Sequence, residues 1–284
     1  MKHQDFLKTY PDGTSYYDLS TAVATTEVVF RLNTYTDLWQ LNQFVDAWNH
    51  TYVVPPTIII PNLLDAQADR RFNAQQSSGL KLVCKFLNNL NAHFKIFHPH
   101  NAEVVEALMD NVTIIDNTTF IIKVLTNLQE GKYISCEPGG ENLILMSSDA
   151  GGFKPLMKLC DNIDWVGETF SANKARKYEN GKTTLTQTIN REDFQGRNIL
   201  LIDDICVYGG TFKGLAKLLK KRNCGKLYLA TSHMTVARPD KELFSLFDKV
   251  FSTNSKGLHY LVDDINDDET PWYTPQNLEI IKLF

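Results

Sequence analysis

Short apolar runs alternate with amphipathic stretches along most of the chain. The runs are rich in Ile, Leu, Val and Phe, and the stretches between them are helix-like. Near-continuous apolar strands that alternate with helices are typical of a parallel sheet covered on both faces. The sequence therefore predicts an α/β protein whose ligands bind beyond the carboxyl ends of the strands. The runs are "TIIIP" (57–61), "FKIFHP" (94–99), "NLILMSSD" (142–149), "NILLIDD" (198–204) and "KLYLATSHM" (226–234), with helix-like stretches at 77–91, 152–160 and 212–223.

The length and one polar stretch indicate two domains. A chain of 284 residues can form two ordinary domains, each with its own core. The glycine-rich segment "NLQEGKYISCEPGGEN" (127–142) separates halves that each contain strand and helix patterns, so we predict domains at 1–135 and 136–284. A second polar stretch, 171–197, has many charges and little apolar content, which predicts a mobile hairpin or loop rather than core.

Composition excludes several classes of protein. The chain is 43% hydrophobic and 22% charged, as in ordinary globular proteins, and its net charge of −4 gives no general attraction to nucleic acid. No window approaches about twenty apolar residues and the N-terminus is too polar for a signal peptide, so we expect a cytoplasmic protein without a membrane partner. The scattered cysteines never form a CxxC pair, which predicts small buried residues rather than disulfides or a zinc site. They are Cys84, Cys136, Cys160, Cys206 and Cys224.

Residues 200–211, "LLIDDICVYGGT", join an apolar run to two adjacent carboxylates and a glycine turn. Asp203 and Asp204 stand where we expect the strand to end, and there they can accept hydrogen bonds from sugar hydroxyls or hold a hydrated Mg²⁺. The backbone amides of residues 209–211, at the start of the next helix, suit a phosphate. The alternative is a strand end whose acids simply face water.

A second carboxylate follows an apolar run. Asp149 precedes Ala150, Gly151 and Gly152, and a turn of such small residues lets a diphosphate approach the backbone. By itself Asp149 is as readily explained as an ordinary helix N-cap. Together with residues 203–211 it predicts a second wall of one anion site.

The segment 200–211 resembles the phosphoribosyl diphosphate binding motif of type I phosphoribosyltransferases and ribose-phosphate diphosphokinases. Further segments are similar to the second family, in its order along the chain. They are "YPDGT" (10–14), "DAQADRRFNAQQSSGLKLVCKFLNNL" (65–90), "FHPHNAEVVEALMDNV" (97–112) and "MSSDAGGFKPLMKL" (146–159). The chain thus resembles the ribose-phosphate diphosphokinase (PRPP synthetase) family, most closely its short, divergent branch in phages and some bacteria. The resemblance implies two tandem type I phosphoribosyltransferase-like domains, each a mostly parallel sheet flanked by helices, in a homo-oligomer (dimer or hexamer).

The resemblance assigns the ATP site, and contacts between subunits, to the N-terminal domain. Tyr10 and Asp12 would frame the adenine, and the arginines would meet the triphosphate, for which guanidinium groups are suited. Without the resemblance each of these is an ordinary surface residue. Gln67 stands where the family commonly has arginine and Thr14 where it often has an acid, so the pose of ATP stays open. The implied ATP contacts are Tyr10, Asp12, Gln67, Asp69, Arg70, Arg71 and His100, with Mg²⁺ held by His100 and Asp149.

The C-terminal domain would hold the acceptor and the catalytic cations. The resemblance assigns catalysis to Lys174 and Arg176 of "NKARK", on a flexible loop 171–197, with Lys177 as a competing assignment. A charged loop is by default merely solvated, but diphosphoryl transfer builds negative charge that cations on a closing lid can neutralise. The implied ribose and diphosphate site is Asp149, Ala150, Gly151, Gly152, Asp203, Asp204, Val207, Tyr208, Gly209, Gly210 and Thr211.

The implied reaction is attack by the anomeric hydroxyl of a ribose 5-phosphoryl compound on the β-phosphorus of Mg·ATP, which releases AMP. In the family an acid and a threonine stand where this chain has Val207 and Tyr208. Either the backbone amides suffice for ribose 5-phosphate, or the phosphate continues into a larger group for which an aromatic surface is suited. ADP-ribose fits the second interpretation, and its 1-diphosphate would serve NAD resynthesis. A non-catalytic regulatory homologue and a type I phosphoribosyltransferase are the alternatives.

Overall fold

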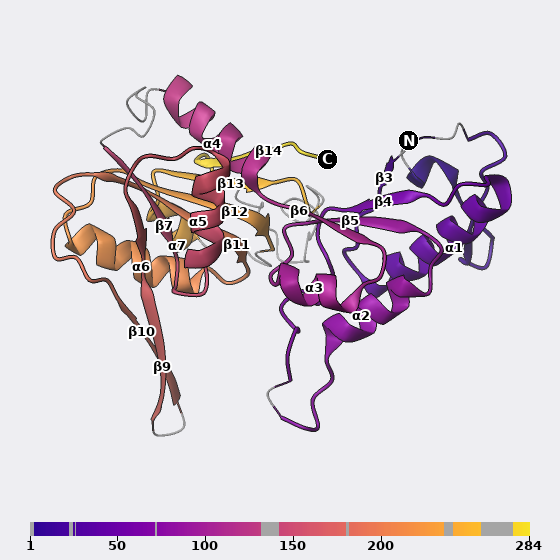
Figure 1. Cartoon of the computed structure of the whole chain (residues 1–284), viewed down its shortest axis with the longest axis horizontal. Helices are drawn as coiled ribbons and strands as arrows, with labels where there is room; N and C mark the ends of the chain where they lie inside the picture. The colour runs from indigo at the N-terminus through magenta and orange to yellow at the C-terminus, as the bar shows by residue number, and fades with distance from the viewer. Residues whose placement is uncertain are drawn as a thin grey trace. The chain divides into compact units, whose positions relative to one another are not determined.

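The computed structural model describes residues 3–22, 25, 27–71, 73–131, 142–179, 182–235, 241–256 and 275–284. The chain divides into two units (Figure 1). Unit 1 comprises residues 1–116, 255–257 and 284, and unit 2 comprises residues 117–254 and 258–283. This division falls earlier than the predicted boundary between residues 135 and 136, because the helix α4 (Thr118–Glu130) contacts strands of unit 2.

Unit 1 is built on a parallel sheet with the strand order β3-β4-β5-β6. The strands are Glu27–Val29, Thr57–Ile60, His93–Phe97 and Val112–Ile115, and the helices α1 (Tyr35–Thr51), α2 (Gly79–Asn88) and α3 (Ala102–Leu108) connect them in turn. A short antiparallel pair, β1 (Leu7–Thr9) and β2 (Ser15–Tyr17), follows a single 3-10 turn at His3–Phe6. The strands predicted at 57–61 and 94–99 and the helix at 77–91 are confirmed.

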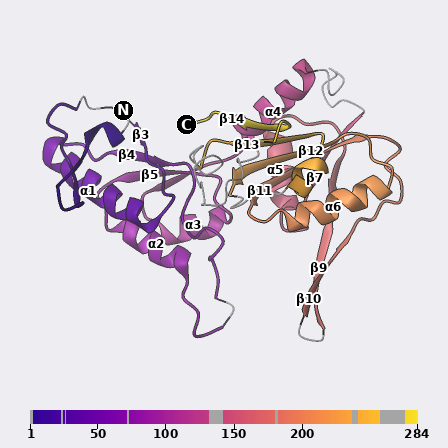
Figure 2. The same ribbon diagram turned by 180° about the vertical axis from the view of Figure 1, so that it is seen from behind.

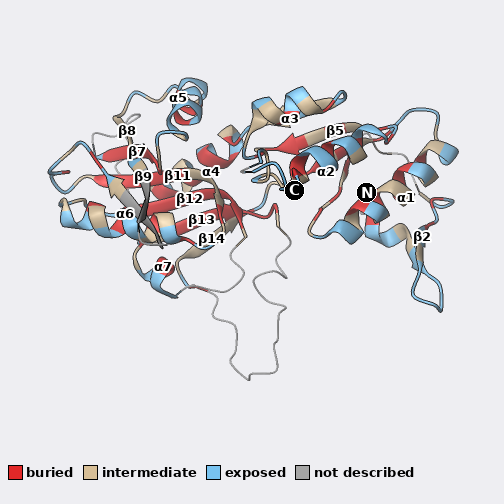
Figure 3. Ribbon diagram, turned by 90° about the horizontal axis from the view of Figure 1, so that it is seen from below, coloured by how far each residue is buried: buried red, intermediate tan, exposed pale blue. Residues whose placement is uncertain are grey.

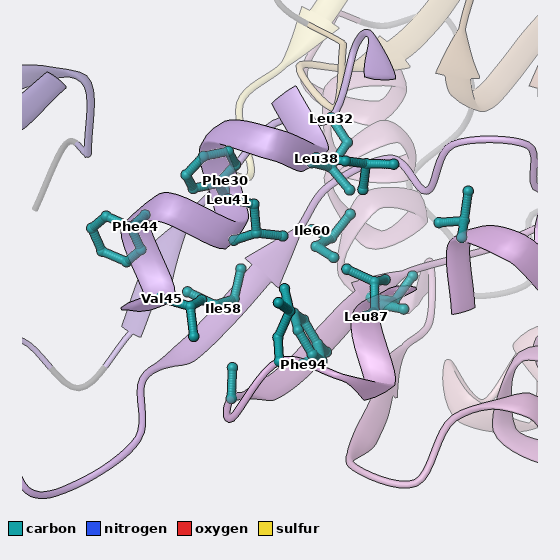
Figure 4. Close-up of a cluster of buried hydrophobic side chains, with 14 of the residues drawn as sticks. Phe30, Leu32, Leu38, Leu41, Phe44, Val45, Ile58, Ile60, Leu87 and Phe94 are labelled. Atoms are coloured by element: carbon teal, nitrogen blue, oxygen red, sulfur yellow. The ribbon is translucent and has the colours of Figure 1, made fainter. Parts of the chain in front are cut away.

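The core of unit 1 forms where apolar faces of these helices meet the sheet. Phe44 and Leu41 of α1, Leu87 of α2 and Ile58 and Phe94 of the sheet are almost fully buried (Figure 4). The first turn of α1 is fixed by Asp37, whose carboxylate accepts a 2.7 Å hydrogen bond from the backbone N–H of Thr34. Burial of such apolar groups is the main force that stabilises the unit.

Unit 2 contains a second parallel sheet, with the order β14-β13-β12-β11-β7-β8. The strands β7 (Leu143–Ser147) and β12 (Leu227–Met234) are buried along their whole length, as expected for a sheet covered on both faces (Figure 3). The hairpin of β9 and β10 occupies most of the predicted loop 171–197. The remaining elements are β8 (Thr169–Ser171), β9 (Asn173–Glu179), β10 (Lys182–Thr188), β11 (Asn198–Cys206), β13 (Lys249–Thr253), β14 (Leu278–Ile281), α5 (Phe153–Asn162), α6 (Gly210–Lys221) and α7 (Lys241–Ser245).

The structure also bears on two further expectations, the burial of the cysteines and the absence of a membrane-spanning helix. Cys84, Cys160 and Cys206 are buried and Cys224 is half-buried, which confirms the interpretation of these cysteines as small core residues, whereas Cys136 lies outside the described residues. Burial raises the pKa of the Cys84 and Cys160 thiols to about 11, which disfavours the reactive thiolate form. Across the described ranges, no helix combines the length and the apolar character that a membrane crossing requires.

Candidate active site

The acidic pair lies at the carboxyl edge of the unit 2 sheet. β11 pairs with β7 as far as Ile202, and Asp203 and Asp204 follow this last pair. The strand does not end at the acids as we predict from the sequence: it continues to Cys206, because β12 extends beside it. Ser148 donates a hydrogen bond to Asp203 Oδ2, and the backbone N–H of Asp204 donates to Asp203 Oδ1 at 2.9 Å. These contacts fix one carboxylate at the edge of the sheet.

The environment of Asp203 disfavours its charge. Burial raises the pKa of the Asp203 carboxyl to about 8, and the charge and hydrogen bond of Asp204 act in the same direction. The hydrogen bond from Ser148 opposes the shift. Two carboxylates this close ionise together only when a cation or hydroxyl donors approach them. The pair is therefore suited to a ligand with neighbouring hydroxyls or to a positive ion.

A glycine turn leads from β11 into α6. Gly209 has a φ of +66°, which side chains rarely adopt, and a Cβ there would lie 2.8 Å from Leu243 Cδ2. A Cβ on Gly210 would meet nothing within 4 Å, so the space beside the start of α6 is open. The first N–H groups of a helix have no partner within it, and the positive end of the helix dipole attracts anions. The position of residues 209–211 therefore supports the predicted phosphate site.

The two residues before this turn differ in exposure. Val207 is half-buried, whereas the side chain of Tyr208 is 80% exposed. An aromatic ring that is open to solvent beside a phosphate turn offers a surface on which a second group can stack.

The predicted diphosphate loop, residues 149–152, follows the neighbouring strand β7. Asp149 Oδ1 accepts a 3.1 Å hydrogen bond from the backbone N–H of Gly152, which is itself the N-cap of α5, so Asp149 precedes the N-cap and fixes the turn before it. The hydroxyls of Ser147 and Ser171 hold the carbonyl of Asp149 at 2.9 and 3.1 Å. Ala150 and Gly151 are exposed. The loop backbone is thus held from below and open above, which a diphosphate requires.

The β9–β10 hairpin leaves unit 2 beside α6 (Figure 2), and a side chain at its base contacts the phosphate turn, residues 209–211. Lys174 Nζ donates a 3.1 Å hydrogen bond to Thr211 Oγ1. Arg176 and Lys177 stand farther along β9, opposite Leu185 and Thr184, and their side chains lie outside the described part of the structure. The structure therefore brings Lys174 to residues 209–211 and leaves the assignments of Arg176 and Lys177 as predictions.

Unit 1 holds the residues predicted to bind ATP. Asn101 Nδ2 donates a 3.2 Å hydrogen bond to Asp69 Oδ2, which joins the segment after β4 to the turn after β5. Gln67, Arg70, Arg71 and His100 are exposed at this junction or beside it. Asp69 and His100 thus belong to neighbouring loops of one unit, as an ATP site there requires.

A tight turn between β1 and β2 carries the predicted adenine contacts. Asp12 Oδ1 accepts hydrogen bonds from the hydroxyl and the backbone N–H of Thr14, at 2.7 and 3.0 Å. These bonds lower the pKa of the Asp12 carboxyl, with the hydroxyl contributing most. The ring of Tyr10 stacks on that of Tyr16 with centroids 4.6 Å apart and is still half exposed. An exposed ring of this kind can stack on a base.

A divalent cation fits the oxygen donors of unit 2. Mg²⁺ prefers one or two carboxylates together with water and substrate phosphates to a closed protein cage. Asp203 lies beside the loop of Asp149, and burial and Asp204 disfavour its charge. A cation bound there would stabilise the ionised carboxylate of Asp203. Within the described ranges no group of three or more His, Cys, Asp and Glu side chains gathers, and His100 belongs to unit 1. The assignment of His100 and Asp149 as metal ligands therefore stays a prediction.

Sequence reasoning overlooked three residues that organise these loops: Ser148, Asn101 and Gln187. Ser148 lies inside the quoted segment "MSSDAGG", and its position beside a strand-end acid could have identified it. Asn101 caps α3 by accepting from the N–H of Val104 at 3.2 Å, and an Asn before a helix pattern signals that role. Gln187 gives no local signal, because its partner is 24 residues away in sequence.

Comparison with known proteins places the chain in a family. The model of the phosphoribosyl transferase domain matches residues 112–265, just over half of the chain. A ribose-phosphate pyrophosphokinase of Chlorobaculum tepidum is 26% identical over 222 residues, which cover 77% of this chain and 64% of that protein. One of Methanosarcina acetivorans is 23% identical over 232 residues, or 81% of this chain and 75% of that protein. The chain thus spans just under two thirds of the first of these relatives.

A solved structure shows the same fold. The phosphoribosylpyrophosphate synthetase of Mycobacterium smegmatis matches 97% of this chain and 85% of its own, with a TM-score of 0.71 at 16% sequence identity. The match extends over both units and confirms the predicted arrangement of two α/β domains with mostly parallel sheets. The chain therefore belongs to the phosphoribosyl transferase domain family, and over most of its length it is similar to ribose-phosphate pyrophosphokinases.

Proposed function

We propose that the protein transfers a diphosphoryl group from ATP to the anomeric hydroxyl of a ribose 5-phosphoryl compound and releases AMP. The observation that carries this proposal is the arrangement at the carboxyl edge of unit 2. There Ser148 joins the diphosphate loop to Asp203, and Lys174 reaches Thr211 of the phosphate turn. Ligands of parallel α/β sheets bind at this edge. Relatives that are named ribose-phosphate pyrophosphokinases agree with the proposal.

In this proposal the chain mainly positions its substrates. Asp203 and Asp204 accept hydrogen bonds from the ribose hydroxyls, and the turn 209–211 holds the 5-phosphate. The anomeric hydroxyl gives up its proton to water as its oxygen bonds to the β-phosphorus of ATP. The bond from that phosphorus to the oxygen bridging to the α-phosphate breaks, and AMP leaves with the electron pair. Positioning of this kind supplies much of the rate enhancement in phosphoryl transfer.

Charge on the transferred group has to be neutralised. Lys174 donates a hydrogen bond to Thr211 of the phosphate turn, and Arg176 follows it along β9. An ammonium group that meets the developing charge lowers the barrier more than it strengthens ground-state binding. Mg²⁺ held beside Asp149 and the acidic pair would supply further positive charge to the phosphate oxygens.

We assign ATP to the loops of unit 1. Tyr10 and Asp12 lie in one exposed turn, and Asp69 is joined to the loop of His100 through Asn101. Arg70 and Arg71 are exposed beside Asp69, where guanidinium groups can meet phosphate oxygens. Gln67 lacks such a charge, so we expect fewer ionic contacts to ATP than an arginine there would give.

The acceptor is the finer part of the proposal. Tyr208 is 80% exposed directly before the phosphate turn, and Val207 offers no polar group. These side chains suit a phosphate diester that continues into a stacked base better than a terminal phosphate. We therefore propose that ADP-ribose is used at least as well as ribose 5-phosphate, and that its 1-diphosphate product serves as a donor for NAD resynthesis.

A coupled assay of AMP release tests both the diphosphoryl transfer and the identity of the acceptor. Wild-type protein is supplied with Mg·ATP and either ribose 5-phosphate or ADP-ribose. A kcat/KM for ADP-ribose equal to or above that for ribose 5-phosphate supports the finer proposal. A preference of tenfold for ribose 5-phosphate, about 1.4 kcal/mol, contradicts it and leaves a PRPP synthetase with an altered turn. Tyr208→Ala should selectively weaken use of ADP-ribose, whereas Tyr208→Phe keeps the ring and should resemble wild type.

Two other functions predict no release of AMP, and a further measurement distinguishes each of them. A regulatory homologue without catalysis would bind no Mg·ATP in calorimetric titration, although Lys174, Asp203 and Asp204 are all present. A type I phosphoribosyltransferase would release no AMP and would instead turn over a nucleobase. A type I phosphoribosyltransferase does not need a second unit with a sheet of its own, so the presence of unit 1 argues against this function.

A further inference from the structure

Two side chains at the base of the hairpin hold the same residue of α6. Lys174 Nζ donates to the hydroxyl of Thr211 at 3.1 Å, and Gln187 Nε2 donates to the carbonyl of Thr211 at 3.0 Å. In the β9–β10 register Lys174 and Gln187 are direct cross-strand partners. Figures 1 and 2 both show the hairpin leaving the body of unit 2 beside α6. The hairpin is therefore attached to the first turn of this helix through one residue pair.

A glycine in α6 makes room for this attachment. A Cβ at Gly214 would lie 2.3 Å from Gln187 Oε1, far inside van der Waals contact. Glycine inside a helix costs about 1 kcal/mol relative to alanine, so its presence at Gly214 weakens α6. At Gly210, by contrast, a Cβ would meet nothing within 4 Å. The close approach of Gln187 is thus a physical reason for a glycine at position 214.

The two hydrogen bonds differ in what an anion would do to them. The ammonium of Lys174 lies beside the N-terminus of α6, where the helix dipole is also positive, so an incoming anion is attracted to both. Such an anion competes with Thr211 for Lys174. Gln187 is neutral and donates to a backbone carbonyl, so an anion attracts its amide less strongly than it attracts the ammonium of Lys174. The contact of Gln187 can therefore persist while Lys174 moves onto the ligand.

We propose that Gln187 is a positioning residue: it anchors β10 to Thr211, keeps its cross-strand partner Lys174 over the phosphate turn, and requires Gly214 for its approach. The effect of this anchor on turnover rests on the proposed function. The anchor itself does not, because it joins only residues of unit 2.

The decisive variant is Gly214→Ala. The new methyl group should push the flexible end of Gln187 aside while alanine favours the helix, so Tm should equal or exceed that of wild type. We expect kcat for AMP release to fall about tenfold with the KM for ATP within threefold, because misplacing a catalytic cation acts on the reaction step. Amide hydrogen exchange in residues 173–179 and 182–188 should become faster.

Gln187 variants and a control separate positioning from general damage. Gln187→Met keeps the length of the side chain but has no donor, so it should show the same loss of kcat and the same faster exchange. The double variant Gly214→Ala with Gln187→Met should be no worse than either alone, because both remove one contact. Thr188→Ala changes the neighbouring exposed residue of β10 and should resemble wild type.

The outcomes that overturn the proposal are distinct from failure of the proposed function. Unchanged hydrogen exchange of the hairpin in both Gly214→Ala and Gln187→Met excludes the anchor. If hydrogen exchange stays normal and the double variant loses as much kcat as the product of the two single losses, Gly214 has a role separate from Gln187. That outcome also contradicts the proposal. If wild type releases no AMP with either acceptor, the proposed function fails, but the exchange experiment still decides whether Gln187 anchors the hairpin.

Discussion

The two parallel sheets place their polar residues differently. In unit 1, buried residues alternate with half-buried ones along β4, and polar side chains on the less buried face form pairs across strands. There Lys95 bonds to Glu27, and His93 Nε2 lies 3.0 Å from Thr113 Oγ1. In unit 2, β7 and β12 are buried throughout, and their serine, threonine and histidine residues lie towards the carboxyl ends of the strands.

This difference separates a structural use of polar residues from a functional one. The pairs of unit 1 join charges and hydrogen-bonding groups that balance one another at the surface. At the edge of unit 2, Asp203 pairs in register with Thr231, which in turn pairs with Ser252. Thr231 Oγ1 is buried without a hydrogen-bond partner among the described residues, and the charge of Asp203 is disfavoured by its surroundings. Unbalanced polar groups at one edge are typical of a binding site.

The largest expected effect tests whether the hairpin base belongs to that site. Lys174→Ala should lower kcat by on the order of 10²-fold or more and leave Mg·ATP binding within a few-fold, because the cation acts on developing charge. Steady-state AMP release and calorimetric titration measure the two quantities. Lys95→Ala removes a lysine that is paired on the sheet of unit 1 and is the matched control. Near-normal turnover of Lys174→Ala would remove this residue from catalysis. We expect a similar loss for Arg176→Ala.

The next effect concerns the variant Asp203→Asn, which should lower activity but raise thermal stability. Asp203→Asn should lower kcat/KM for the ribose acceptor by about tenfold or more while the KM for ATP stays within a few-fold. The folded-state pKa of Asp203 is raised to about 8 from an ordinary value of 3.8, so ionisation weakens the fold as pH rises through this range. The neutral amide avoids this loss. Tm of the variant should therefore exceed that of wild type at pH 8.5, and the difference should shrink towards pH 4.

Asp204→Asn provides the companion measurement, since its carboxylate is assigned to the same ribose hydroxyls. Acceptor kinetics that stay unchanged in both variants would contradict the assignment of the acidic pair. A Tm difference between Asp203→Asn and wild type that is independent of pH would show that the charge of Asp203 is not what destabilises this edge.

The sequence allowed the strands and the candidate loops to be predicted because their signals are local. "NILLIDD" identifies a buried strand with two acids, and the glycines after it mark the turn into α6. The attachment of Gln187 to Thr211 could not be predicted, because it depends on how a hairpin meets a helix that follows it in the chain. The register of Asp203 with Thr231 is likewise set by tertiary pairing.

The position of α4 shows the same limit for domain boundaries. Its apolar residues Phe120, Ile121, Val124 and Leu128 are buried, but their helical spacing does not tell which sheet they cover. The contacts of α4 with β12 and β14 decide that it belongs to unit 2. A polar stretch such as 127–142 therefore marks a connection in the chain without marking the end of a domain.

A third effect tests the core of unit 1 through pH. His3 is buried, stacks on Phe30 with ring centroids 3.7 Å apart, and its Nδ1 lies 2.8 Å from the hydroxyl of Tyr17. Burial lowers the pKa of His3 from 6.5 to about 4. The folded state thus favours the neutral ring, and stability present above pH 6.5 is lost as pH falls towards 4, by about 2 kcal/mol at pH 5. Urea unfolding at pH 8 and pH 5 measures this loss.

Two variants isolate the contribution of His3 from other acid effects. His3→Phe has no titrating ring and should lose less stability between pH 8 and pH 5 than wild type does. His50→Phe replaces an exposed histidine of α1 and is the matched control. Equal pH dependence in His3→Phe and wild type would show that the protonation of His3 does not couple to folding.

The smallest expected effect returns to the polar face of the unit 1 sheet. The side chains of Lys95 and Glu27 are 34% and 40% exposed, and ion pairs in contact with solvent contribute about 0.2–1 kcal/mol. Lys95→Met should therefore lower the free energy of unfolding by less than about 1 kcal/mol, and 0.5 M NaCl should reduce the difference from wild type. Glu27→Gln should give the same small loss, and the double variant should be less than additive because the two residues share one interaction. A loss well above 1 kcal/mol that salt does not reduce would mean that this face is shielded from water, and the contrast with the covered sheet of unit 2 would then no longer hold.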